Sequence, residues 1–326
     1  MTESAIIVGG GGSLFDTMAR RLPSAIREAG ADAQRRFVEF FAANIRNPNT
    51  RLAYARAVWR FFEWCEQRRV SLSDITPLHV SLYVEERMRV ASAPTVKQHL
   101  AAIRVLCDWL VVGQILKTNP ASSVRGPRYS IKKGKTPVLS ADEARELLEG
   151  IDVTTIAGLR DRALIAVMVY SFARVGAVVA MNVEDYFSQG RRMWFRLHEK
   201  GGKLHDVPAH HKAEEYVDAY LNAALIETDR HTPLFRSLDR HRQLGTRRIH
   251  RLEVLAMIKR RARQVGLPPS IGCHTFRATG ITTYLKNGGM LEHAQRIANH
   301  ESARTTGLYD RRSDEVSLDE IERIIL

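Results

Sequence analysis

The chain has 326 residues, 44% of them apolar and 26% charged, which is the composition of a soluble, well-cored protein with room for two domains. No apolar run approaches the ~18–20 residues of a membrane span and the chain does not start with a secretion signal, so we expect neither a membrane protein nor a secreted one. The net charge of +13 favours a polyanionic partner such as nucleic acid, although ribosomal proteins and membrane-surface binders are basic too.

The first 30 residues contain a run of four glycines at positions 9 to 12. A glycine cluster can belong to a dinucleotide-binding loop, but no acidic ribose ligand follows here in a βαβ context. We therefore expect residues 1–30 to form a flexible N-terminal arm.

Residues 31–117 are predicted to form helices. Starts are expected at Asn49-Thr50, at the segment 73–77 and at the segment 92–95, where capping residues precede periodic apolar positions. Apolar residues three to four apart then indicate helices with one buried face. The expected core positions are Leu52, Ala55, Val58, Trp59, Phe62, Val80, Tyr83, Val84, Val96, Leu100, Ile103, Leu106 and Leu110. The arginines between them fit either a solvated face or contacts to phosphate.

Residues 118–136 combine Pro, Gly and basic side chains with little apolar periodicity. This is linker composition, and its positive charge would suit a strap against a nucleic-acid backbone. We place the boundary between two domains in this stretch.

Residues 137–312 are predicted to form a second domain. Ser140 can cap a helix whose first turn carries Asp142 and Glu143, which complement the helix dipole. β-type residues around the Gly201-Gly202 turn predict a hairpin or the edge of a small sheet within 183–207. Further helices are expected at 160–180, 213–224, 251–265 and 275–287.

The cysteines of the chain, Cys65, Cys107 and Cys273, lie far apart without any C-x-x-C pairing. Cys65 and Cys107 fall within apolar helical patterns, so we expect buried free thiols. Such thiols fit a reducing cytoplasm.

Several polar residues of the second half are suited to phosphoryl transfer at DNA. In chain order they are Arg174, Lys200, the His274-Thr275-Phe276-Arg277 run, His300 and Tyr309. Arginines can donate two hydrogen bonds to the oxygens of a phosphate and stay charged at any working pH. A tyrosine hydroxyl can attack a phosphodiester if nearby cations or a base favour loss of its proton.

This order, with His300 nine residues before Tyr309, resembles the tyrosine recombinase (phage integrase) family over about residues 31–326. The resemblance implies a mainly α protein with a small antiparallel β-sheet, built from an N-terminal helical core-binding (SAM-like) domain and an α+β tyrosine-recombinase catalytic domain. It implies a site-specific recombinase of integrase or resolvase type that cleaves and rejoins DNA strands through a 3′-phosphotyrosyl intermediate. Four protomers would assemble on two sites in double-stranded DNA, without metal, ATP or another cofactor.

The same resemblance assigns a role to each residue. Arg174 and Arg277 would clamp the phosphate. His274 would donate to the phosphate and accept the proton of Tyr309, the nucleophile. His300 would hydrogen-bond the phosphate as part of the cage that stabilises its charge.

The segment from Glu199 to Lys203 resembles the hairpin of the family in which a lysine precedes a glycine turn and a second basic residue follows. Lys200 would then protonate the departing 5′-oxygen, and Lys203 is the other candidate. A lysine with a pKa of about 10.4 is a strong enough acid for an alkoxide. Without the resemblance, this segment is simply a polar turn.

The chain departs from the family pattern at two positions. Asn299 replaces the usual glycine before His300, a mild change because Asn tolerates a left-handed backbone. Ala177 stands where many members have an acidic residue that supports the active site, three positions after Arg174. Residues 313–326 are expected to form an amphipathic helix that docks on its own chain or, as the resemblance implies, on a neighbouring protomer.

Other functions are left open by the sequence. One is a type IB topoisomerase-like nicking-closing enzyme, which shares the chemistry. Another is a DNA-binding regulator that has lost catalysis, which would need a broken set of site residues. A metal-dependent nuclease is disfavoured because no Asp/Glu cluster has ligand spacing. The target site remains open, as does the choice between integration, resolution and resolution of chromosome dimers.

Overall fold

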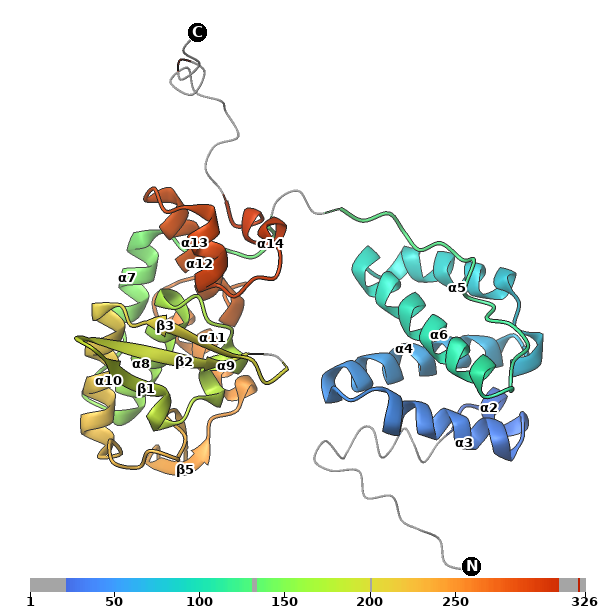
Figure 1. The fold of residues 1–326 in the computed structure, drawn as a ribbon, viewed down its shortest axis with the longest axis horizontal. Helices are drawn as coiled ribbons and strands as arrows, with labels where there is room; N and C mark the ends of the chain where they lie inside the picture. Colours follow the sequence, from blue (N-terminus) through green and yellow to red (C-terminus); the bar gives the residue numbers. More distant parts are fainter. Residues whose placement is uncertain (1–21, 131–133, 200, 311–321, 323–326) are drawn as a thin grey trace, which may run out of the picture. The chain divides into compact units, whose positions relative to one another are not determined.

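The computed structural model describes residues 22–130, 134–199, 201–310 and 322. The chain divides into two compact units, Met1–Ser130 and Ile131–Leu326 (Figure 1). We call them the helical unit and the α+β unit. Their fold class is the one predicted.

All regular elements in the described part of the helical unit are helices. Its elements are α2 (Ser24–Glu28), α3 (Ala31–Glu39), the π-helix η1 (Phe40–Asn44), α4 (Pro48–Gln67), the short η2 (Leu72–Asp74), α5 (Pro77–Val90) and α6 (Ala93–Val112). The predicted starts of α5 and α6 are confirmed, with Thr76 and Ser92 at their N-caps. The N-cap of α4 is Asn47, two residues before the predicted Asn49. The side chain of Asn47 accepts hydrogen bonds from the amides of Asn49 and Thr50.

A single apolar core holds the helical unit together. The predicted core positions are buried except Leu52 and Trp59, which are half-buried. The core extends beyond the residues 31–117 predicted for this domain. Ala25 and Ile26 of α2, from the stretch expected to be an arm, are buried in it. Ala121 and Val124, from the expected linker, are buried in it too.

The α+β unit alternates helices with two small sheets. Its elements are α7 (Ala141–Glu149), α8 (Ile156–Tyr170), α9 (Val175–Ala180), η3 (Val183–Asp185), β1 (Tyr186–Gln189), β2 (Arg192–His198), β3 (Leu204–Pro208), α10 (His211–Ala224), β4 (Arg236–Leu238), β5 (Leu244–Arg248), α11 (Arg251–Gln264), α12 (Cys273–Lys286), α13 (Leu291–Ile297) and α14 (Ala303–Gly307). Helix α8 packs against α10 and α12. The predicted cap of α7 is confirmed, since Ser140 and Glu143 form a capping box.

The predicted hairpin is part of a three-stranded antiparallel sheet in the order β1-β2-β3. The turn between β2 and β3 contains Gly201 and Gly202 with φ of 83° and 77°, a left-handed conformation that suits glycine. The antiparallel pair β4-β5 was not predicted from the sequence. Its second strand, β5, has no fully buried residue and lacks the alternating apolar pattern of a half-buried strand.

The helix predicted over 160–180 is interrupted. Helix α8 ends at Tyr170 and α9 begins at Val175, with Phe172 between them at a left-handed φ of 52°. The Phe172 ring lies against Gly280 of α12, where an added Cβ would come within 2.7 Å of the ring and 2.1 Å of the Val169 carbonyl oxygen. This close approach of α12 to the chain after α8 places Arg174 at the N-cap of α9.

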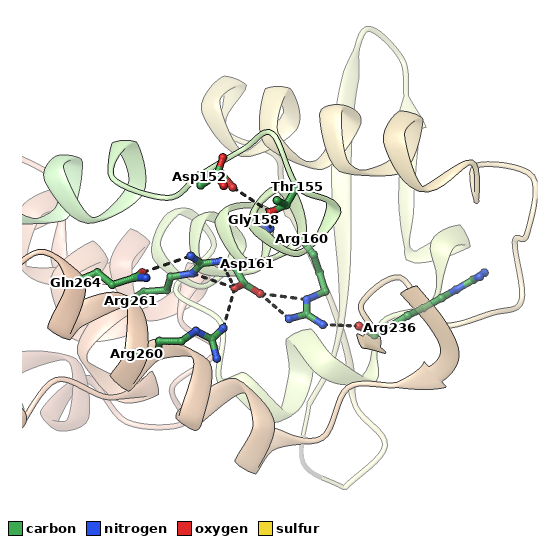
Figure 2. Close-up of polar contacts among 9 residues, drawn as sticks. All are labelled: Asp152, Thr155, Gly158, Arg160, Asp161, Arg236, Arg260, Arg261 and Gln264. Atoms are coloured by element: carbon green, nitrogen blue, oxygen red, sulfur yellow. Dashed lines mark hydrogen bonds and ion pairs between the residues drawn. The ribbon is translucent and has the colours of Figure 1, made fainter. Parts of the chain in front are cut away.

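A buried carboxylate joins α8 to α11 (Figure 2). Asp161 is fully buried and receives hydrogen bonds from Arg160 at 2.6 Å, Arg261 at 2.8 Å and Arg260 at 3.4 Å. Arg160 also donates to the carbonyl oxygen of Arg236 in β4. A charge removed from water needs such partners, and together they fix α11, which leads into α12, against α8.

Candidate active site

Tyr309 lies just after α14, at the end of the unit where α12, α13 and α14 come together (Figure 1). It is 7% exposed and packs in a small apolar cluster with Phe172, Ala278 and Ala298. Its carbonyl oxygen accepts from the Thr282 hydroxyl at 2.9 Å. The tyrosine is therefore held in a fixed position.

The hydroxyl of Tyr309 lies 2.9 Å from Nε2 of His274, in the first turn of α12. Burial, together with the charges of Arg277 and Arg174, lowers the pKa of His274. The imidazole is therefore neutral at neutral pH, and in the tautomer with an unprotonated Nε2 it accepts the hydrogen bond from the tyrosine.

The ring of His300 stacks on that of Tyr309, with centroids 5.8 Å apart and planes 9° from parallel. Its Nδ1 forms a 2.9 Å hydrogen bond with the hydroxyl of Thr306. Burial, together with the positive charges of Arg277 and Arg174, lowers the pKa of His300 to about 3. Asn299, just before it, has a left-handed φ of 47°, the conformation for which Asn is a mild replacement of glycine.

Arg277, one turn after His274, is 1% exposed. Its guanidinium donates to the carbonyl oxygen of Phe172 and, at 2.5 Å, to that of Ala298. Burial and the neighbouring Arg174 lower the pKa of Arg277 to about 10, so it stays cationic at neutral pH. The break after α8 thus supplies one of the acceptors that hold this arginine.

Arg174 has a side chain that is 42% exposed, and its NH1 group donates to Oε2 of Glu199 at 2.8 Å. Glu199 directly follows the last residue of β2, and its side chain is only 5% exposed. Sequence reasoning gave no role to this glutamate. The available signal was a charged residue two positions before the Gly201-Gly202 turn, and such a residue is also common in purely polar hairpins.

Lys200 lies outside the described residues. The alternative proton donor Lys203 is exposed, and its Nζ lies 3.5 Å from a carboxylate oxygen of Glu301. The amide of Glu199 donates to the carbonyl oxygen of Lys203 at 2.8 Å, which closes the β2–β3 turn. His205 of β3 contacts the carbonyl oxygen of Ile297 at 3.1 Å, so the hairpin lies against α13.

The structure thus brings Arg174, His274, Arg277, His300 and Tyr309 into one cluster, in which both arginines act electrostatically on both histidines. Ala177, where the family often has an acid, is buried at 3% exposure. In the part of the chain that the structure describes, no group of three or more His, Cys, Asp and Glu side chains could hold a metal ion. In the same part, no helix is both long and apolar enough to span a bilayer.

Comparison with known proteins identifies the family. Residues 137–315 match the model of the phage integrase family, and residues 35–113 match that of the phage integrase N-terminal SAM-like domain. The chain belongs to the phage integrase family. It is a tyrosine recombinase, as the order of its polar residues predicted, and its class of enzyme cleaves and rejoins DNA.

Individual relatives agree with this assignment. The tyrosine recombinase XerC of Chlamydia pneumoniae is 30% identical over 249 residues, which cover 75% of this chain and 77% of the relative. The fold is shared with XerH bound to its difH substrate, at a TM-score of 0.64 and 20% identity over 92% of this chain and 86% of XerH. It is also shared with a lambda integrase tetramer bound to a Holliday junction, at a TM-score of 0.63 and 17% identity over 87% and 78% of the two chains.

Proposed function

We propose that this recombinase breaks and rejoins double-stranded DNA at specific sites by attack of the Tyr309 hydroxyl on a phosphodiester. The observation that carries the proposal is the 2.9 Å hydrogen bond between this hydroxyl and Nε2 of His274, within reach of two arginine charges.

In the first step, the Tyr309 oxygen forms a bond to phosphorus while its proton moves to Nε2 of His274. The bond from phosphorus to the 5′-oxygen breaks, which leaves a 3′-phosphotyrosyl link and a departing oxygen that needs a proton. Lys200 is the proposed source of this proton, and Lys203 the alternative. Attack by a 5′-hydroxyl then reverses these steps and rejoins the strand.

The two arginines would stabilise the charge that builds up on the phosphate. A guanidinium has five N–H donors. Arg277 uses two of them on carbonyl oxygens and Arg174 uses one on Glu199, so both retain donors for phosphate oxygens. His300, stacked on the tyrosine, would add a further hydrogen bond from its free ring nitrogen in the appropriate tautomer.

We further propose that the helical unit, predicted as residues 31–117 and with a core that reaches from Ala25 to Val124, is a DNA-binding domain. The basic stretch predicted as the linker 118–136 would join it to the catalytic domain 137–312. The net charge of +13 supports binding to DNA.

The fold shared with a DNA-bound integrase tetramer supports assembly of four protomers on two sites. Residues 313–326, predicted to dock on their own chain or on a neighbouring protomer, lie outside the described residues apart from Glu322. The free thiols of Cys65 and Cys107, both buried, suit a cytoplasmic enzyme. The bacterial relatives support a gene carried by a bacterium or a mobile element.

Substitution of the nucleophile tests the proposal. Tyr309→Phe removes the reacting oxygen and retains the ring that stacks on His300, so covalent capture of a nicked suicide DNA should be abolished. Specific binding of the same DNA, measured by gel shift, should be retained. A Phe variant that still captured DNA covalently would refute the role of Tyr309. Tyr284→Phe is the matched control and should capture DNA as the unmodified protein does.

A further inference from the structure

The carboxylate of Glu199 is the most buried acidic group in contact with the proposed site residues in the described part of the chain. Its side chain is 5% exposed, whereas that of its partner Arg174 is 42% exposed. A buried carboxylate is costly unless it is paired, and here the pair is formed at 2.8 Å with Arg174 NH1. The glutamate is therefore anchored inside the protein, while the arginine can still reach solvent.

The residue one helical turn after Arg174 provides no carboxylate to hold the guanidinium. Ala177 lies three residues on, and its amide donates to the carbonyl oxygen of Arg174 at 2.9 Å. Its methyl group is buried and cannot accept a hydrogen bond from a guanidinium. The carboxylate that this position often supplies in the family is absent here.

We propose that Glu199 is the positioning residue for Arg174, and that it supplies from the β2–β3 turn the carboxylate that Ala177 lacks. The proposal rests on the function proposed above for Arg174 as a phosphate clamp. Glu199 accepts one N–H of the guanidinium and limits its rotation, and the remaining donors face the phosphate in a fixed orientation. Less conformational freedom is then lost when DNA binds.

The same residue links two parts of the proposed reaction. Glu199 directly precedes Lys200 in the chain, and its amide closes the turn by donating to the carbonyl oxygen of Lys203. The side chain of Glu199 thus ties the turn that carries both candidate proton donors to the arginine that clamps the phosphate. Loss of the Glu199–Arg174 pair should disturb both groups, and mainly in the reaction step.

The central test is Glu199→Gln, which keeps the shape of the side chain and removes its charge. Cleavage of a suicide DNA is measured in single turnover at saturating protein, together with the dissociation constant for the same DNA. We expect the cleavage rate to fall about 10- to 100-fold, because misplacement of a reacting group is costly in the transition state. The dissociation constant should change less than about 3-fold, since substrate binding is carried by many other contacts. Cleavage at the unmodified rate would overturn the proposal.

Asp206→Asn is the matched control on the same hairpin. Asp206 pairs with Arg196 at 2.9 Å, but both side chains are more than a third exposed. This variant removes an arginine-paired carboxylate without touching Arg174 and should cleave normally. An equal loss of rate in both variants would mean that the hairpin is merely destabilised, and would overturn the specific role of Glu199.

A second variant tests whether Glu199 positions Arg174 or only stabilises the fold. It places a carboxylate at residue 177 of α9 in the protein that lacks the charge of Glu199. Ala177→Glu added to Glu199→Gln should recover most of the cleavage rate, because residue 177 is one helical turn from Arg174. A folded double variant as slow as Glu199→Gln would count against the proposal. If thermal melting shows that Ala177→Glu alone unfolds the protein, Glu199→Asp takes its place. The Asp variant, which keeps the charge, should then cleave faster than the Gln variant, and equal rates would overturn the proposal.

Failure of this inference can be told apart from failure of the proposed function. If the unmodified protein captures DNA and Tyr309→Phe does not, the proposed function stands whatever Glu199→Gln shows. If Tyr309→Phe also captures DNA, the proposed function fails before Glu199 is considered.

Discussion

The hydroxyl of Tyr309 and Nε2 of His274 are joined by a 2.9 Å hydrogen bond, although 35 residues separate them in the chain. The pair exists because α12 begins beside the segment that follows α14, and the Thr282 hydroxyl of α12 holds the carbonyl of Tyr309. The proposed nucleophile and its proposed proton acceptor are thus held by one helix. The chemistry and the stability of this region therefore depend on the packing of α12.

The proton donor can be identified with a modified substrate. Lys200→Ala should slow cleavage of ordinary DNA, and a 5′-bridging phosphorothiolate should restore the rate because its sulfur departs without a proton. Lys203→Ala, the matched control, should cleave both substrates at similar rates. Selective rescue of Lys203→Ala would move the role of general acid to that residue. Single-turnover cleavage on the two substrates measures both variants.

Two buried histidines should make the protein less stable in weak acid. Burial lowers the pKa of His300 to about 3 and that of His99, in the helical unit, to about 4. Well above pH 6.5 these rings are neutral in both the folded and the unfolded state. Below pH 6.5 the unfolded state gains protons that the folded state does not, so the free energy of unfolding falls as the pH decreases towards these values.

Each histidine should contribute a loss of about 2 kcal/mol between pH 7 and pH 5, given an ordinary pKa of about 6.5. Chemical denaturation at both pH values measures this change. His99→Gln replaces a ring that forms a hydrogen bond with Tyr83 and should reduce the pH dependence of the transition that includes the helical unit. A variant with the same pH dependence as the unmodified protein would contradict the assignment.

Gly280→Ala should destabilise the α+β unit by about 1–3 kcal/mol, as overpacking of a close contact does. The added Cβ would lie 2.1 Å from the Val169 carbonyl oxygen and 2.7 Å from the Phe172 ring. Gly176→Ala is the control, because its added Cβ meets nothing within 4 Å and the residue lies inside α9. The control should be neutral or stabilise by up to about 1 kcal/mol. Denaturant titration distinguishes them, and equal midpoints would refute the packing argument.

Much of the fold could be predicted because helix caps and apolar spacing are local signals. Thr76, Ser92 and Ser140 all stand at N-caps where the sequence placed helix starts. The break at Phe172 could not be predicted, because α8 is apolar around most of its circumference and nothing in its pattern marks the end. That break depends on Gly280, more than 100 residues later, which allows α12 to approach.

The candidate site was predictable to the extent that its residues form short motifs. His274 and Arg277 share a helical turn, and His300 and Tyr309 lie close in the chain. Glu199 gave no usable signal, since its pairing with Arg174 depends on how β2 packs against α9. Contacts between distant elements, unlike motif spacing, become visible only in the folded chain.

The most direct test of the central claim is to identify the residue that becomes linked to DNA. The protein is trapped on a suicide substrate, digested with nuclease and trypsin, and the modified peptide is sequenced by mass spectrometry. The account predicts a nucleotide remnant on the peptide of residues 305–311, which carries Tyr309. A remnant on the peptide of residues 278–286, which carries Tyr284, or on any other peptide, would contradict it.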